Sequence, residues 1–125
     1  MIAPDITRRE DVELLVNTFY EKVRANSVIG YKFDEVAKVN WETHLPKMYS
    51  FWSSLLLDEH SFVGNPMQKH IALSKLTSMT AVDFSEWLKL FTETVNELFE
   101  GEKAEDAKRN AASIARLMLH KIETV

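Results

Sequence analysis

Apolar side chains recur at helical spacing through most of the chain, and this periodicity constrains the fold more than any other feature. In four stretches the apolar residues lie three or four positions apart, which places them on one face of an α-helix. These stretches follow Thr7, Trp41, Thr80 and Gly101. Three glycines and three prolines leave few breaks, and we find no convincing strand. The pattern predicts an all-α fold, and we expect one domain spanning residues 1–125.

The first two long helices carry signals at their ends. Thr7-Arg8-Arg9-Glu10 has the form of a capping box, and the helix after it should end near Asn26. The second pattern runs from Trp41 to Leu57 and includes Pro46. Its apolar residues form a narrow seam on one helix face: Trp41, Leu45, Met48, Trp52, Leu55 and Leu56. Because proline lacks an amide hydrogen, we expect the regular helix to begin close to Thr43 or to be kinked at the proline.

The other two long helices are marked in the same way. Thr80-Ala81-Val82-Asp83 predicts a capped helix start, and Gly101 predicts a helix end. The last helix has small residues along its apolar stripe, which favours close packing against a neighbour. A shorter helix is expected to begin at Asn65-Pro66, because asparagine caps helices well and proline fits the first helical position.

Composition excludes several classes of function. A formal charge of −4 argues against nucleic acid as the main partner, since such proteins present a basic face. The absence of cysteine excludes disulfides, thiolate catalysis and iron–sulfur clusters. No run approaches the ~20 apolar residues of a membrane span, and the N-terminus lacks the pattern of a secretory signal. The expected setting is therefore cytoplasmic, with no membrane partner.

Among the four histidines, His70 is the one placed within the apolar stripe of a short helix, beside Met67 and Ile71. No HExxH pair, nucleophile elbow or phosphate-binding glycine loop is present. One imidazole holds a bare metal ion poorly, whereas haem brings four ring nitrogens and needs one histidine.

A porphyrin also requires apolar walls and a few polar donors opposite the histidine. Candidates for the walls are Phe33, Met48, Phe51, Trp87 and Phe91. Candidates for the donors are Tyr20, His44 and Trp87. From the residues alone, a helical binding or scaffold domain stays open as an alternative. In that reading His70 is a core residue, Tyr20 packs with its hydroxyl at the surface, and His44 is a surface or cap residue.

Several segments occur in a distinctive order. They are Phe19-Tyr20-Glu21-Lys22-Val23, Ile29-Gly30, Phe33, Trp41-Glu42-Thr43-His44-Leu45-Pro46-Lys47-Met48, Phe51-Trp52, Gly64-Asn65-Pro66, His70 and Trp87-Leu88-Lys89-Leu90-Phe91. In order and approximate spacing, from about Asp5 to Ile122, they resemble group III truncated haemoglobins. The glycine pairs of groups I and II are missing, which fits group III.

The resemblance implies a shortened globin fold in which two antiparallel helix pairs sandwich haem b. Carried over by position, His70 matches the proximal iron ligand. Tyr20, His44 and Trp87 match the distal residues that face a bound ligand. The remaining matches are to residues that line the porphyrin or the ligand cavity, namely Phe19, Phe33 and Met48. Lys47, His60 and Lys69 are candidates for the haem propionates.

The function implied is binding, and with it transport, of oxygen or other small diatomic ligands. Two alternatives stay open: a haem enzyme that is peroxidase-like or oxidises nitric oxide, and a haem-free helical interaction domain. With no reductase domain in the sequence, an unidentified reductant or reductase is the expected electron donor. Neither the physiological ligand nor the oligomeric state follows from the sequence.

Overall fold

The computed structural model describes residues 3–30, 40–57 and 80–123, with side chains as far as residue 117. These ranges contain four α-helices and no strand. They are α1 (Arg9–Ala25), α2 (Trp41–Leu56), α4 (Ala81–Leu98) and α5 (Glu102–Glu123). The predicted all-α class is confirmed for this part of the chain. Within it, no helix is both long enough and apolar enough to cross a membrane.

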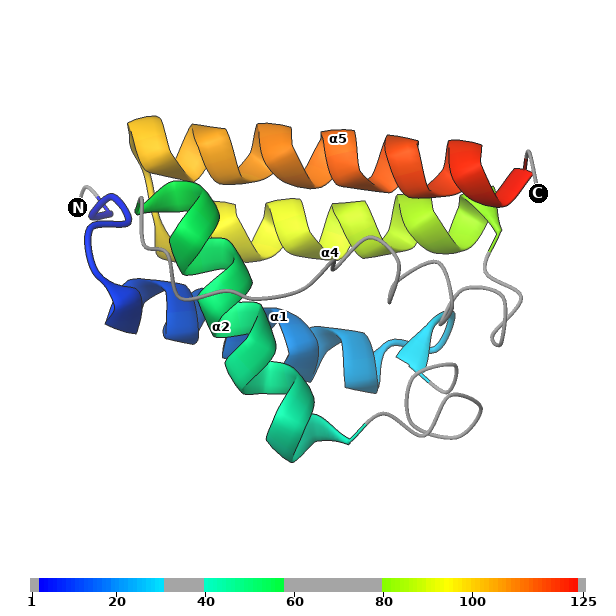
Figure 1. The fold of residues 1–125 in the computed structure, drawn as a ribbon, viewed down its shortest axis with the longest axis horizontal. Helices are drawn as coiled ribbons and strands as arrows, with labels where there is room; N and C mark the ends of the chain where they lie inside the picture. Colours follow the sequence, from blue (N-terminus) through cyan, green and yellow to red (C-terminus); the bar gives the residue numbers. More distant parts are fainter. Residues whose placement is uncertain (1–2, 31–39, 58–79, 124–125) are drawn as a thin grey trace.

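Helices α4 and α5 lie side by side and run in opposite directions (Figure 1). The face of α5 toward the core carries buried alanines, which allow the two helix backbones to approach closely: Ala104, Ala107, Ala111 and Ala115. The buried residues of α4 are mostly larger apolar and aromatic ones, among them Phe84, Trp87, Phe91 and Val95. The expected close packing of the last helix is therefore confirmed.

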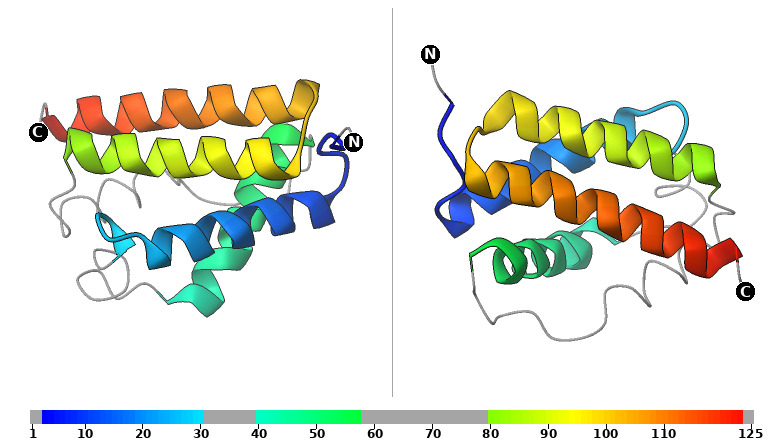
Figure 2. Two further views of the ribbon diagram at one scale, coloured as in Figure 1. Left: turned by 180° about the vertical axis from the view of Figure 1, so that it is seen from behind. Right: turned by 90° about the horizontal axis from the view of Figure 1, so that it is seen from above.

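Helix α1 packs against α4, and α2 crosses α1 at a steep angle while also contacting α5 (Figures 1 and 2). The core forms where these elements meet. Polar contacts at the rim fix α1 in place. Lys22 Nζ lies 2.6 Å from a carboxylate oxygen of Glu97 on α4. Arg9 donates from its guanidinium to Ser50 Oγ on α2 at 3.2 Å.

The start of α1 differs in one residue from our expectation. The carboxylate that accepts hydrogen bonds at this end is Asp11, not Glu10. Asp11 Oδ2 accepts from the backbone N–H groups of Thr7 and Arg8 at 2.9 and 3.0 Å, and from the Thr7 hydroxyl at 3.2 Å. If Thr7 were the cap, the helix would begin at Arg8 and its third residue would be Glu10. The helix instead begins at Arg9, so its third residue is Asp11.

Helix α2 begins at Trp41, so of the two alternatives the start near Thr43 is wrong, and the kink stays a prediction. Asn40 caps the helix, with its side chain accepting from the backbone N–H of Glu42 at 3.1 Å. Pro46 lies inside the helix. One member of the expected apolar seam, Leu55, is 45% exposed and does not belong to the core.

The predicted cap of α4 is confirmed. Asp83 accepts from the backbone N–H of Thr80 at 2.8 Å, and Thr80 Oγ1 accepts from the Asp83 N–H at 3.4 Å. The reciprocal bonds satisfy backbone donors that the first helical turn leaves without partners.

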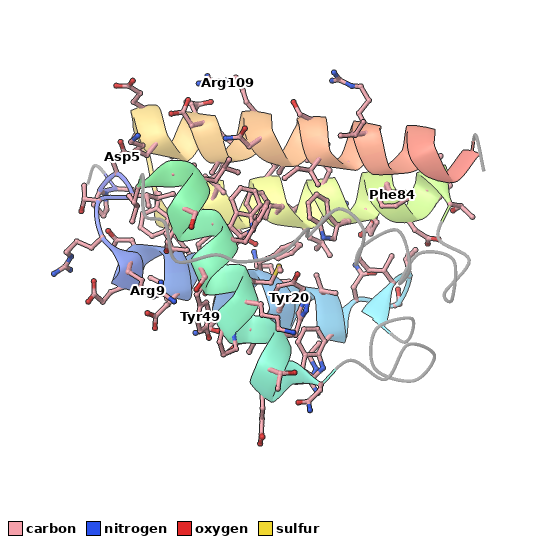
Figure 3. The ribbon with its side chains drawn as sticks, in the orientation of Figure 1. Asp5, Arg9, Tyr20, Tyr49, Phe84 and Arg109 are labelled. Carbon is pink, nitrogen blue, oxygen red and sulfur yellow. The ribbon has the colours of Figure 1, made fainter. Side chains whose placement is uncertain are left out.

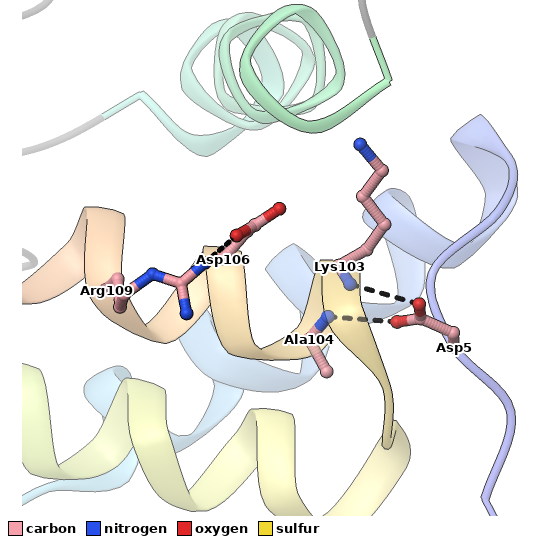
Figure 4. A network of polar contacts seen from close by, with 5 residues as sticks. All are labelled: Asp5, Lys103, Ala104, Asp106 and Arg109. Atoms are coloured by element: carbon pink, nitrogen blue, oxygen red, sulfur yellow. Dashed lines mark hydrogen bonds and ion pairs between the residues drawn. The ribbon is translucent and has the colours of Figure 1, made fainter.

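The corner between α4 and α5 is closed by a residue from the start of the chain. Gly101 has φ +143°, a conformation that side chains rarely adopt, and a Cβ there would lie 2.5 Å from Asp5 Cγ. The Asp5 carboxylate accepts from the backbone N–H groups of Lys103 at 3.0 Å and Ala104 at 2.9 Å (Figure 4). It therefore caps α5 from a distant part of the sequence, and Gly101 is the residue that leaves room for it.

Candidate functional site

Two predicted polar residues meet where α1 and α2 cross. Tyr20 lies on α1 (Figure 3) and is 6% exposed. Its hydroxyl oxygen lies 3.2 Å from Nε2 of His44 on α2. Tyr20 shares the apolar face of α1 with Val16 and Val23, which explains its burial. His44 lies one turn into α2 and is half-buried. The structure thus brings together two donors that the sequence places 24 positions apart.

Aromatic rings from two helices adjoin this pair. The Phe19 ring lies 4.9 Å from the Tyr20 ring and 5.6 Å, edge-on, from Trp87 of α4. Trp87 is buried. The third predicted distal residue is therefore connected to Tyr20 through Phe19.

The chemistry of this region follows from its burial. Burial raises the pKa of the Tyr20 phenol above its ordinary value, because ionisation in an apolar setting is unfavourable. The hydroxyl therefore keeps its proton at neutral pH and is able to donate or accept. Whether the Tyr20 hydroxyl donates to His44 Nε2 or accepts from it depends on the imidazole tautomer.

The predicted wall residues that are described lie on one continuous aromatic surface. Phe91 stacks on Trp52 at 4.8 Å and on Trp87 at 5.9 Å. Phe51 is half-buried beside Trp52, and Met48 is buried in the same core. Phe33, His60, Lys69 and His70 lie outside the described residues. Lys47 is exposed on α2.

Sequence reasoning missed a contribution from Trp41. Its ring lies 5.1 Å from Tyr20 and 5.7 Å from His44, and the guanidinium of Arg24 lies 5.1 Å from its centre. Trp41 was assigned only to the apolar seam of its helix. The available signal was its spacing, since a residue three positions before His44 shares a helix face with it.

A cavity of about 270 Å³ lies beside this cluster. Its lining comes from α1 and α2: Asn17, Tyr20, Glu21, Arg24, Trp41 and Leu45. Tyr20 therefore both lines the cavity and makes the partly buried contact with His44.

No family model matches the chain. A group 3 truncated haemoglobin of Campylobacter jejuni is 32% identical over 110 residues, which cover 86% of this chain and 84% of that protein. The crystal structure of a group III truncated haemoglobin from Campylobacter jejuni superposes with a TM-score of 0.82 at 30% identity. That superposition covers 98% of this chain and 95% of the other, so the truncated globin fold that the resemblance implied is confirmed. The chain belongs to the group III truncated haemoglobin family.

Proposed function

We propose that this chain, as a single globin domain over residues 1–125, binds haem b through His70 and takes up oxygen or another small diatomic ligand. Tyr20, His44 and Trp87 are the residues that face this ligand. The observation that carries the proposal is the Tyr20–His44 contact of 3.2 Å, two polar groups aligned inside an otherwise aromatic region of a truncated globin fold.

The described residues fit one side of a haem pocket. Such pockets are mostly apolar and present a few polar groups at set positions. Here Phe19, Met48 and Phe91 supply buried apolar surface, while Tyr20 and His44 supply the polar atoms. Phe51 and, on this proposal, Phe33 extend the apolar wall. Haem, when bound, supplies the iron to which a diatomic ligand coordinates.

The protein side chains act on that ligand by holding protons and excluding water. Tyr20 keeps its proton at neutral pH, and burial raises its pKa further. In the tautomer in which His44 Nε2–H donates to the Tyr20 oxygen, the Tyr20 O–H stays free to donate to the ligand. A fixed donor in a dry pocket stabilises a ligand that carries partial negative charge more strongly than a donor in water does. Trp87 offers a second N–H, and Phe19 fills the space between Trp87 and Tyr20.

The test is the absorption spectrum of the purified protein in its ferric, ferrous and ferrous carbonyl forms. The expected result is a strong Soret band after haem addition, with a ferrous carbonyl spectrum typical of a histidine-ligated haem. His70→Ala should lose tight haem uptake, whereas His120→Ala, a matched histidine substitution on α5, should retain it. Equal uptake by both variants would contradict His70 as the ligand.

Turnover assays separate the ligand-binding role from the enzymatic alternative. An oxygen-binding protein should show little peroxidase turnover and little nitric oxide consumption when supplied with a reductase and reductant. High turnover in either assay would replace binding with catalysis as the main function, while leaving haem binding intact.

A further inference from the structure

Trp41 lies against both members of the Tyr20–His44 pair. Its ring centre is 5.1 Å from that of Tyr20, with the planes tilted by 59°. It is 5.7 Å from the His44 ring, with the planes at 79°. Tyr20 and His44 also meet edge-on, at 5.3 Å and 78°. The three rings therefore form a closed triangle, and movement of any one of them changes the contacts of the other two.

The triangle explains what keeps His44 directed inward. A half-buried histidine near the start of a helix has an alternative position in solvent, since neighbouring water satisfies its nitrogens equally well. Trp41 is the first residue of α2 and lies on the same helix face as His44, one turn before it. Its indole occupies the space beside the imidazole, and edge-to-face ring packing favours the observed orientation.

Trp41 is itself fixed from α1. The Arg24 guanidinium lies 5.1 Å from the ring centre, within the distance at which a cation is attracted to an aromatic face. The cavity of about 270 Å³ lined by Arg24 and Trp41 lies beside this contact. The indole thus has open space next to it, and the Arg24 contact favours the position in which the ring stays against Tyr20 and His44.

We propose that Trp41 is a positioning residue for the ligand-facing pair. It keeps the Tyr20 hydroxyl and His44 Nε2 within hydrogen-bond distance of each other, and Arg24 holds it there. The effect on ligand release rests on the proposed function, whereas the effect on the orientation of His44 does not.

The experiment compares Trp41→Leu, Trp41→Phe and Arg24→Met with wild type. Tyr49→Leu is the matched control, because Tyr49 is an aromatic residue of α2 (Figure 3) whose hydroxyl contacts α1 through Asn17. Three readouts are used on the full chain: the C–O stretching frequency of the ferrous carbonyl form, the oxygen dissociation rate, and ¹⁵N NMR of the His44 ring.

Trp41→Leu should shift or split the C–O stretch and average the His44 ring signals between tautomers. It should also speed oxygen dissociation by about threefold to tenfold, the range expected for loss of one hydrogen bond. Arg24→Met should change each readout in the same direction by a smaller amount. Trp41→Phe should restore most of the wild-type values, and Tyr49→Leu should leave the C–O stretch and the His44 signals unchanged.

Wild-type C–O stretch and His44 signals in both Trp41→Leu and Arg24→Met would overturn the proposal. Equal changes in Tyr49→Leu would also overturn it, since they would show a general effect of loosening α2. If Trp41→Leu does not fold, Trp41→Phe and Arg24→Met decide the question. If the wild-type chain takes up no haem, the proposed function fails, and the His44 NMR signals alone decide whether Trp41 positions the imidazole.

Discussion

The rings of Trp52 and Phe91 stack with their centres 4.8 Å apart and their planes 23° apart, which joins α2 directly to α4. The ring of Trp87 also stacks on Phe91, with the centres 5.9 Å apart and the planes 15° apart. Phe91 is almost fully buried and also meets Phe19 edge-on at 5.2 Å. It is therefore the ring through which three helices contact one another.

Replacing Phe91 by alanine should lower the free energy of unfolding by about 3–5 kcal/mol, because it removes a buried ring and leaves a cavity among rigid neighbours. The measurement is urea denaturation followed by far-UV and near-UV circular dichroism. Val82 lies on the same helix and its side chain is 67% exposed, so Val82→Ala should change the free energy of unfolding by no more than about 0.5 kcal/mol. A similar loss in both variants would contradict the role given to Phe91.

The Asp5 carboxylate predicts a specific acid dependence. Burial acts to raise its pKa, but hydrogen bonds from the backbone N–H groups of Lys103, Ile6 and Ala104 outweigh burial and lower the pKa below the ordinary value. Such a group stabilises the fold above the unfolded-state pKa of about 3.9, and this contribution is lost as the pH falls through the lower folded-state pKa.

Asp5→Asn should therefore be less stable than wild type at neutral pH by about 1 kcal/mol, the usual scale for losing a helix cap. The difference should shrink below about pH 4, as the wild-type carboxyl takes up its proton. Melting temperatures of both proteins across this range measure it. A difference that stays constant down to the lowest pH would contradict the assignment.

Gly101→Ala should destabilise the same corner for a steric reason. Its φ of +143° is unfavourable for alanine, and the added Cβ would lie 2.5 Å from Asp5 Cγ. The expected loss is about 1–3 kcal/mol, from backbone strain and from displacement of the cap. Combining Gly101→Ala with Asp5→Ala should cost less than the sum of the single changes, because part of the clash is then removed.

Two buried hydroxyls should respond in opposite ways to removal. Ser53 Oγ is fully buried and has no hydrogen-bond partner among the described residues, so Ser53→Ala should leave stability unchanged or raise it by up to about 1 kcal/mol. Thr94 Oγ1 donates to the Leu90 carbonyl at 2.7 Å, so Thr94→Val should lower stability by about 1 kcal/mol. Thermal denaturation of both variants beside wild type measures the two changes in stability.

Tyr20→Phe and Trp87→Phe should each accelerate oxygen dissociation if their O–H and N–H groups stabilise the ligand. The loss of a net hydrogen bond corresponds to about threefold to tenfold per variant. Stopped-flow displacement of oxygen by carbon monoxide gives the rates. Unchanged rates in both variants would show that these two groups do not stabilise the bound ligand. The proposal that the chain binds haem would not be affected.

Local features of the chain were predictable because they depend on neighbours in sequence. Helical spacing located α1, α2, α4 and α5, and the Thr80–Asp83 cap was identified from four adjacent residues. Errors arose where two interpretations of a helix end differ by only one or two positions. Glu10 and Asp11 are adjacent acids, and the structure uses the second.

Contacts between distant segments were beyond what spacing can show. The Tyr20–His44 contact depends on where α1 crosses α2. The sequence offered both residues as candidate donors, but spacing could not show that they touch. The Asp5 cap of α5 joins positions 98 and 99 residues apart, so no local pattern marks it. Trp41 was visible as an apolar residue, but its contacts with Tyr20, His44 and Arg24 appear only in three dimensions.

The Asp5 cap also sets an order for folding during synthesis. Asp5 leaves the ribosome long before Lys103 and Ala104, so its carboxylate cannot accept from these two N–H groups until that later part of the chain has been made. Helix α1 is able to form early from its own sequence, whereas the corner between α4 and α5 becomes complete only when the beginning of the chain returns to it. Ribosome-bound chains that end before residue 103 should therefore lack this closure.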